Sequence, residues 1–338
     1  MNLNARLEVE FEGEPGVDAG SLTREYFNML MGLLRCGETA SMPPLFEGQE
    51  GHIIPVHSVD ALSSGCFYIA GQMIAHSLLH GGVGMVGMSK AVSRYIASEG
   101  TNAEQASTFL TVDDIPDLDT RNVLLKIRDA EDQTEFDALN KSELVSRLML
   151  AAGVNVLLGS ATRTIAFQDL LLHEVLLMRH QEIVDISKGM QSLSLITLLK
   201  MNESLLNVTF PSLDDMSVSP EEIKTKVTLH WEFSNNDLSP EQMQARSYFL
   251  EFIDHGIKSS VEEGVTMDLF LRFLQGCPGP LQDRTIKLKF HKTKAETFPF
   301  IDACFVILTL PVCHDSYASF EENMSKAILY GHEGYGKV

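Results

Sequence analysis

The sequence is poor in cysteine, in tryptophan and in basic residues for its length. Its 338 residues include five cysteines, at 36, 66, 277, 304 and 313, and none belongs to a C-x-x-C pair. This spacing excludes a disulfide framework and a zinc-finger pattern, so we expect reduced thiols. No apolar run approaches the roughly 18–20 residues that cross a bilayer, and the first residues do not resemble a secretory leader. We therefore expect a cytoplasmic or nuclear protein without membrane contact.

Basic residues are outnumbered by acidic ones, 26 to 46, which gives a net charge of −20. A nucleic-acid partner needs a Lys/Arg-rich surface, so we expect no nucleic-acid partner.

Metal-ligating patterns are also missing from the sequence. His76 and His80 are spaced as on one helix face, but the glutamate of an H-E-x-x-H site is absent. We expect no metal and no cofactor.

Gly82, Gly84 and Gly87 match the G-x-G-x-x-G pattern of dinucleotide-binding loops. Such a loop must lie between a strand and a helix, because the helix N-terminus holds the pyrophosphate. Here a helical pattern precedes the glycines, so they predict a connection between two helices. Dinucleotide binding is kept as a remote alternative.

Helical periodicity dominates the first two thirds of the chain. It predicts helices over 60–80, 89–98 and most of 117–205. A short strand is expected over 6–12, where apolar and charged residues alternate. The polar, proline-containing stretch SNNDLSPEQ at 234–242 is the best candidate for a domain boundary.

The remaining residues alternate between helix and strand signals. Two helices are expected between 245 and 276, and Ile286, Leu288 and Phe290 alternate with lysines as in a half-buried strand. The apolar run CFVILTL, 304–310, predicts a central strand. Ser319 and Glu322 form a candidate capping box for a last helix. We predict an α+β fold.

Cys304 poses the main question, because a single cysteine before a strand is usually a buried small hydrophobe. The preceding segment ETFPFIDA is loop-like, which favours an exposed sulfur at a loop-to-strand junction. A thiolate is a strong nucleophile even when a few per cent of the thiol is ionised, and an activated thioester needs no dedicated base. No protease-like Cys–His–Asn signature surrounds it.

The carboxyl-terminal part of the chain resembles the HECT family of ubiquitin ligases. The family pattern is roughly L-P-x-A-x-T-C-F-N-x-L-x-L-P. The matching residues are Phe298, Pro299, Cys304, Phe305, Leu308, Leu310 and Pro311, with Leu271, Phe273, Leu274 and Gly276 upstream. Tyr335 stands where the family has the fourth-from-last phenylalanine.

The amino-terminal part agrees with a second set of motifs. FEGEPGVDAGSLTREYF resembles F-x-G-E-x-G-x-D-x-G-G-L-x-R-E-F-F, and IAGQMIAHSLLHGG resembles a G-R-x-I-G-x-A-L-x-H-G helix. Gly20, Leu22, Arg24, Gly71 and His80 are among the matches. The similarity is greatest to a divergent branch represented by the G2/M phase-specific E3 ubiquitin-protein ligases.

The resemblance implies a bilobed HECT-like fold. It consists of a large, mostly helical N-lobe at 1–233, a hinge at 234–242, and a small α+β C-lobe at 243–338. Within the N-lobe, 115–190 would be a divergent, helical form of the subdomain that binds an E2 ubiquitin-conjugating enzyme.

The resemblance also implies a mechanism. Cys304 would accept ubiquitin from the E2 as a thioester and pass it to a lysine of a protein substrate. Tyr335, Phe305 and Pro299 would support the site, and the partners would be ubiquitin, an E2 and the substrate.

Several positions depart from the family pattern around the cysteine. Asp302, Ala303, Val306 and Thr309 replace the family's His, Thr, Asn and Asp, and Ser21 replaces a Gly. The alternative is therefore a catalytically weak or inactive HECT-like scaffold that binds ubiquitin or partner proteins.

Overall fold

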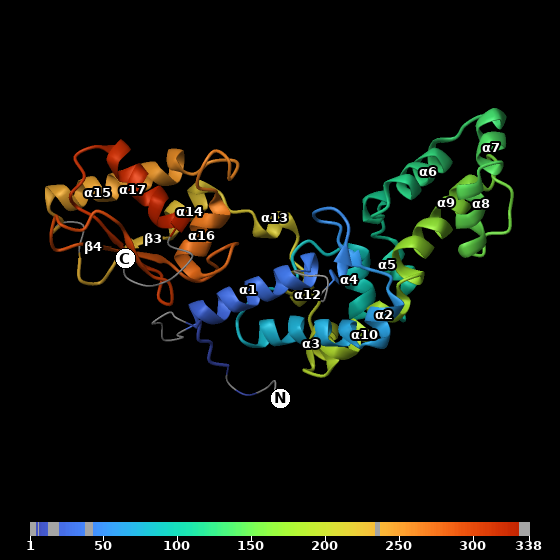
Figure 1. Cartoon of the computed structure of the whole chain (residues 1–338), viewed down its shortest axis with the longest axis horizontal. Helices are drawn as coiled ribbons and strands as arrows, with labels where there is room; N and C mark the ends of the chain where they lie inside the picture. The colour runs from blue at the N-terminus through green and yellow to red at the C-terminus, as the bar shows by residue number, and fades with distance from the viewer. Residues whose placement is uncertain (1–4, 6, 13–19, 38–42, 234–236, 331–338) are drawn as a thin grey trace. The chain divides into compact units, whose positions relative to one another are not determined.

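The computed structural model describes residues 5, 7–12, 20–37, 43–233 and 237–330. Contacts divide the chain into two compact units. The first unit is formed by described residues within 1–5, 30–79 and 84–213, and the second by those within 6–29, 80–83 and 214–338. Both units contain helices, and the larger sheet lies in the second (Figure 1). The predicted α+β class is confirmed.

The predicted lobes and hinge stay predictions. The contact-based division falls between Leu213 and Asp214. Residues 234–236 of the predicted hinge lie outside the described residues. Helix α15 (Pro240–Glu251) occupies the end of the predicted hinge, and Pro240 is at its first turn, where a proline is tolerated.

The first unit is built mainly from short helices. Helix α1 (Ser21–Cys36) has residues in both units. The elements that follow are β1 (Phe46–Glu47), β2 (Ile54–Pro55), α2 (Val59–Ser63), α3 (Cys66–Leu79), α4 (Lys90–Ala97), α5 (Ala103–Ser107), η1 (Val112–Asp114), α6 (Leu118–Asp129), α7 (Gln133–Asn140), α8 (Glu143–Ala151), α9 (Arg163–Leu172), the π-helical turn η2 (His173–Leu177), α10 (His180–Gln191), α11 (Leu195–Met201) and α12 (Leu205–Thr209). Helix α13 (Leu213–Met216) begins at the last residue of the first unit, and its other residues belong to the second.

The helices predicted over 60–80, 89–98 and 117–205 are confirmed, including the helical character of 115–190. Helices α6, α8 and α9 contact one another, and Figure 1 shows them side by side. None of the helices in the described part of the chain is both long and apolar enough to cross a bilayer.

Helices α3 and α10 form the closest helix pair of the first unit, and glycine allows it. A methyl group built on Gly71 would lie 2.0 Å from the carbonyl oxygen of Ile186. One built on Gly189 would lie 2.0 Å from the carbonyl oxygen of Tyr68. The two backbones therefore touch, and any side chain at either position would force them apart. Gly71, one of the motif residues, thus has a packing role.

The second unit surrounds a four-stranded sheet with helices. Its elements are α14 (Pro220–Lys226), β3 (Val227–Leu229), α15, the π-helical turn η3 (Phe252–Gly256), α16 (Met267–Gln275), β4 (Ile286–Phe290), β5 (Phe300–Asp302), β6 (Ile307–Leu310) and α17 (Tyr317–Tyr330). The strand order is β3-β4-β6-β5. Strands β3, β4 and β6 run parallel, whereas β5 is antiparallel to β6.

The core of this unit lies on one face of the sheet. Ile286, Leu288 and Phe290 of β4 are buried, as are Leu308 and Leu310 of β6. They share an apolar cluster with Phe249, Phe270, Leu271, Leu274, Phe320, Met324 and Ile328 from the helices. The half-buried strand predicted at 286–290 is confirmed, because its residues alternate between buried and partly exposed.

Three local predictions are wrong. Residues 7–12 keep their alternation of half-buried and exposed side chains but are not in a strand. The strand predicted over 304–310 begins only at Ile307, because residues 303–306 form a turn. Helix α17 begins at Tyr317, and Ser316 rather than Ser319 caps it by accepting the Ser319 N–H at 3.3 Å.

Candidate functional site

Cys304 lies in the turn that joins β5 to β6. Residues 303–306 form this turn, hereafter the cysteine turn, between two strands whose register pairs Asp302 with Ile307. The Cys304 side chain is partly exposed, and Phe305 beside it is 58% exposed. The sulfur is therefore accessible while the backbone on both sides is fixed in the sheet.

The cysteine turn contains a strained residue. Val306 has φ of +52°, in the left-handed region. A β-branched residue is rarely found there, because its Cβ approaches the carbonyl oxygen, at a cost of about 1–2 kcal/mol. Val306 is also 1% exposed, and its carbonyl accepts the N–H of Lys287 at 2.9 Å. Burial and this hydrogen bond hold the strained conformation and end the turn.

The first turn of α1 contacts the cysteine turn within the second unit. The hydroxyl oxygen of Ser21 lies 3.0 Å from the Cys304 sulfur. Arg24 donates from Nε to the carbonyl of Gln275 at 2.8 Å and from Nη2 to the carbonyl of Ala303 at 3.2 Å. Arg24 thereby connects the end of α16 to the residue before the cysteine.

Gly276 permits this contact. It has φ of +84°, and a methyl group built on it would lie 2.7 Å from the Ser21 carbonyl oxygen. A glycine meets both requirements, because it adopts left-handed backbone and leaves space for the approaching chain. The amino-terminal and carboxyl-terminal motifs therefore meet at Gly276, Ser21 and Arg24.

Two cationic side chains share a hollow with Cys304. Cys304 and Phe305 line a hollow of about 250 Å³ together with Arg284 and Lys287. Asp283 and Thr285 complete its wall. Neither Arg284 nor Lys287 was among the site residues predicted from the sequence.

Asp302 has a structural contact in the same turn. Its carboxylate accepts the N–H of Phe305 at 3.4 Å. An aspartate that bonds a backbone N–H further along the chain stabilises a turn. The replacement of the family's His by Asp302 therefore places a negative charge beside the cysteine and also contributes to the turn.

Two other cysteines of the second unit, Cys277 and Cys313, can be compared with Cys304. Cys277 is buried, and burial raises the pKa of its thiol, although nearby arginines Arg24 and Arg284 oppose this effect. Cys313 is partly exposed like Cys304, and its thiol donates to the carbonyl of Glu296 at 3.4 Å. Burial makes Cys277 a poor nucleophile, whereas Cys313 is a suitable comparison for Cys304.

The three predicted supporting residues differ in where they lie relative to Cys304. Phe305 lines the hollow with Cys304. Pro299 is buried just before β5, and Tyr335 lies outside the described residues. The roles assigned to Cys304, Phe305, Pro299 and Tyr335 stay predictions.

The structure adds Ser21, Arg24, Arg284 and Lys287 to the neighbourhood of Cys304. For Arg24 and the Gly276 region, the signal was present in the sequence, because both belong to motifs that were matched. Their contact could not be deduced from two separate motifs.

The glycine-rich motif at 82–87 connects two helices, as predicted. It follows α3 and precedes α4. A methyl group on Gly84 would lie 2.4 Å from the carbonyl oxygen of Thr209, whose oxygen also accepts the N–H of Met85 at 2.9 Å. Gly84 therefore serves close backbone packing. Among the described residues, no cluster of His, Cys, Asp and Glu has a metal-binding arrangement.

Known proteins resemble this chain over most of its length. A family model described as HECT-domain (ubiquitin-transferase) matches residues 21–338. The E3 ubiquitin-protein ligase UPL2 of Arabidopsis thaliana is 24% identical, over 99% of this chain and 9% of the plant protein. The G2/M phase-specific E3 ubiquitin-protein ligase of Homo sapiens is 23% identical, over 90% of this chain and 40% of the human protein. The chain thus spans less than half the length of either relative.

Proposed function

The chain belongs to the HECT-domain (ubiquitin-transferase) family, and on that premise we propose that it transfers ubiquitin through a thioester on Cys304. The observation that carries the proposal is the position of the sulfur. Cys304 is partly exposed in a turn held by two strands, and it lines a hollow with Arg284 and Lys287. An acceptor of a protein-sized acyl group needs this combination of access and fixed position.

The first step is a transthioesterification. The Cys304 thiolate attacks the carbonyl carbon of the E2–ubiquitin thioester, a new carbon–sulfur bond forms, and the bond to the E2 cysteine breaks. The E2 sulfur leaves as a thiolate. The Ser21 hydroxyl at 3.0 Å can donate to the attacking sulfur and orient it. Arg24 keeps Ala303 in place through its carbonyl.

The second step transfers ubiquitin to a substrate. A neutral lysine amine attacks the thioester on Cys304, an isopeptide bond forms, and Cys304 leaves as a thiolate. The proton lost by the amine passes to solvent. Arg284 and Lys287 line the hollow in which this exchange would occur.

The E2 would dock on the helical segment 115–190. Its helices expose apolar side chains, including Leu118 at 65% and Leu150 at 77%. Exposed apolar groups of this size favour a protein-binding role. The E2 would carry the ubiquitin to the cysteine turn.

The alternative function is an inactive scaffold that binds ubiquitin or partner proteins. The observation that favours it is the strain at Val306, at the position where the family has Asn, a residue that adopts left-handed backbone more readily. Asp302 places a carboxylate in the same turn, where it accepts the N–H of Phe305. Both changes could leave the fold intact while weakening the chemistry.

A trapping experiment separates the two functions. The chain is incubated with E1, ATP, ubiquitin and a panel of E2 enzymes, and products are separated on a non-reducing gel. We expect a DTT-labile adduct with wild type and with Cys313→Ala, and none with Cys304→Ala. If no E2 in the panel gives an adduct, the transferase proposal fails and the scaffold is favoured.

A further inference from the structure

One face of the sheet in the second unit is not covered by the apolar core. Lys287 and Lys289 alternate with the buried residues of β4, so they point away from the core. Thr309 lies on the same side of β6, and Thr228 of β3 is exposed. Parallel strands are usually covered on both faces. An uncovered face on a mostly parallel sheet therefore suggests a binding surface, here called the open face.

The open face is cationic in a strongly acidic chain. Arg284, Lys287, Lys289, Lys292 and Lys294 lie within 284–294, a stretch without a carboxylate, although the net charge of the chain is −20. Lys289 pairs with Glu232 at 3.4 Å and Lys294 with Glu241 at 3.4 Å. Among the described residues, Lys287 and Lys292 have no carboxylate within ion-pair distance. Two lysines of this stretch thus remain uncompensated.

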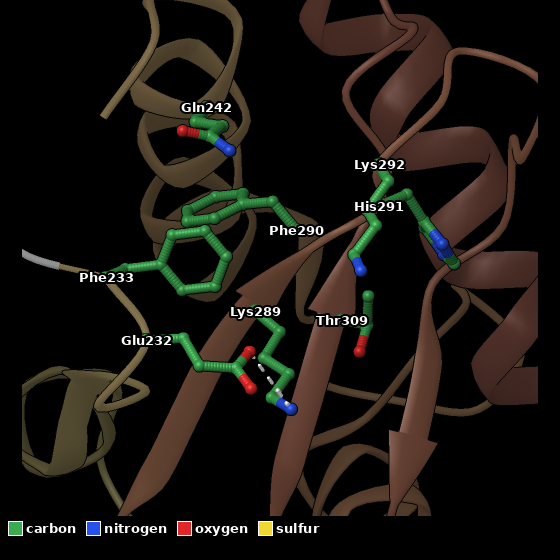
Figure 2. A pocket seen from close by; sticks show the side chains of 8 residues that line it. All are labelled: Glu232, Phe233, Gln242, Lys289, Phe290, His291, Lys292 and Thr309. Carbon is green, nitrogen blue, oxygen red and sulfur yellow. Dashed lines mark ion pairs between the residues drawn. The ribbon is translucent and has the colours of Figure 1, made fainter. Parts of the chain in front are cut away.

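Two hollows lie along β4. The first is the Cys304 hollow, which Lys287 lines. The second has a volume of about 440 Å³ and is lined by Lys289, His291 and Lys292 among others. Figure 2 shows Lys289 and Thr309 on neighbouring strands of this second hollow, with the paired Glu232 beside the lysine. Lys287 and Lys289 are two residues apart, or about 6.7 Å along the strand.

Aromatic side chains accompany the second hollow. Phe233 and Phe290 line it, and their ring centroids are 5.4 Å apart in an edge-to-face arrangement. Figure 2 shows the two rings next to each other. Trp231, two residues before Phe233, is 84% exposed and is the only tryptophan of the chain. Exposed tryptophan is a preferred anchor of protein interfaces.

The pKa of His230 is affected by the same lysines. Burial lowers its pKa most, and Lys289 and Lys287 lower it further, while Glu232 opposes them. Its Nδ1 accepts the N–H of Glu232 at 3.5 Å, which suits the neutral ring. Lys287 and Lys289 therefore lie close enough to act on His230, the residue before Trp231, and Glu232 opposes their effect.

We propose that the open face binds an extended acidic segment of the protein substrate and brings its lysine to Cys304. The inference rests on the proposed function and specifies its substrate class. Acidic side chains at alternate positions of an extended segment would reach Lys287, which has no ion pair among the described residues, and Lys289, where they would compete with Glu232 at 3.4 Å. The second hollow would bind an apolar residue of the segment, and the Cys304 hollow would bind its lysine.

An acidic polypeptide fits this surface better than a nucleic acid does. A phosphate backbone carries a negative charge at every nucleotide. Among the described residues, only Lys287 and Lys292 of the four lysines in 284–294 lack an ion pair, and Glu232 lines the second hollow. A peptide can place its few carboxylates at Lys287 and Lys292 and its amide groups elsewhere.

Trp231 provides the test, because its fluorescence reports binding without any E2. The full chain is titrated with a synthetic peptide in which glutamates alternate with serines around one lysine. The comparison peptide carries glutamines in place of the glutamates. We expect saturable binding of the acidic peptide that weakens with salt, and affinity about tenfold lower for the glutamine peptide.

Charge variants test whether the peptide binds at the open face. Lys287→Glu combined with Lys289→Glu should weaken binding of the acidic peptide by about tenfold or more, and the milder Lys289→Gln should weaken it less. Lys326→Glu changes an exposed lysine of α17 in the same unit and should leave binding intact. Equal affinity for both peptides, no effect of the double variant, or tighter binding of a single-stranded oligonucleotide than of the acidic peptide would each overturn the inference.

The two proposals can fail separately. Thioester formation on Cys304 is measured with E1, E2 and ubiquitin, without peptide. A Cys304 thioester together with no preference for the acidic peptide overturns the substrate class alone. Peptide binding without any thioester overturns the proposed function and leaves only an acidic-peptide site.

Discussion

Two regions of the molecule place opposite demands on the backbone. One is the contact between helices α3 and α10, and the other is the cysteine turn. In the first unit, Gly71 and Gly189 allow two helices to touch, and both glycines are buried. In the second unit, Val306 occupies a strained conformation so that a partly exposed sulfur is held at the end of a strand. At the helix contact, glycines avoid a steric clash because they have no side chain. In the cysteine turn, Val306 keeps an unfavourable left-handed conformation. This difference separates a structural motif from a candidate functional one.

The glycine contact should give the largest effect on stability. Gly189→Ala places a methyl group 2.0 Å from the Tyr68 carbonyl oxygen, so the helices must separate. We expect the free energy of unfolding to fall by about 3 kcal/mol or more, the upper range for overpacking. Urea denaturation measures this change.

Gly32→Ala is the matched control for that prediction. Gly32 is within α1 and has no atom within 4 Å of the built methyl group. Alanine should stabilise the helix by about 0.5–1 kcal/mol. If both variants have the same stability, the close contact between α3 and α10 is refuted.

Arg24 should give the second largest effect. Arg24→Ala removes its hydrogen bonds to the carbonyls of Gln275 and Ala303. We expect a loss of about 2 kcal/mol of stability, typical of hydrogen bonds to a charged group. The rate of single-turnover transfer from E2 to Cys304 should fall about tenfold if Arg24 positions the cysteine turn.

Arg35→Ala provides the comparison on the same helix. Arg35 pairs with the exposed Glu50 at 4.0 Å, and such a pair contributes little, about 0–1 kcal/mol. Both the stability and the transfer rate should stay close to wild type. An Arg24→Ala variant that behaves like Arg35→Ala would contradict a positioning role for Arg24.

Val306 should give the smallest effect, because two contributions oppose each other. Val306→Asn loses buried apolar contacts but relieves the left-handed strain, which asparagine tolerates. Val265 is equally buried, at 1% exposed, and has no left-handed backbone. Val265→Asn should cost about 2–3 kcal/mol.

The difference between the two asparagine variants is the measured quantity. Val306→Asn should be less destabilising than Val265→Asn by at least about 1 kcal/mol, the energy released from the left-handed conformation. Thermal or urea unfolding of both variants gives this number. Equal losses would show that Val306 is not strained.

Helices with long amphipathic patterns could be predicted from the sequence, and local backbone geometry could not. The helices at 66–79, 118–129 and 267–275 follow from apolar periodicity and caps. The run CFVILTL is apolar throughout, so nothing in it signals that Val306 adopts φ of +52° and delays the strand to Ile307. Likewise, an alternating segment such as 7–12 becomes a strand only when another strand pairs with it, and the local sequence does not show whether such a partner exists.

The candidate site shows the same limit. Cys304 and Phe305 were identified from a local motif. Ser21 and Arg24 lie more than 270 residues away from Cys304 in sequence, and their contact depends on the tertiary fold. The alternation at 286–290 already places Lys287 and Lys289 opposite the apolar residues, but only the structure shows that Thr228 of β3 and Thr309 of β6 lie beside them.

The most direct test of the account replaces the sulfur by oxygen. In the presence of E1, E2 and ubiquitin, Cys304→Ser should form an oxygen ester that resists DTT and is cleaved by alkali, whereas the wild-type adduct is removed by DTT. This switch in bond type is expected only if residue 304 carries the acyl group. A wild-type adduct that persists in DTT, or a Cys304→Ser adduct that DTT still removes, would contradict the assignment of Cys304 as the acceptor.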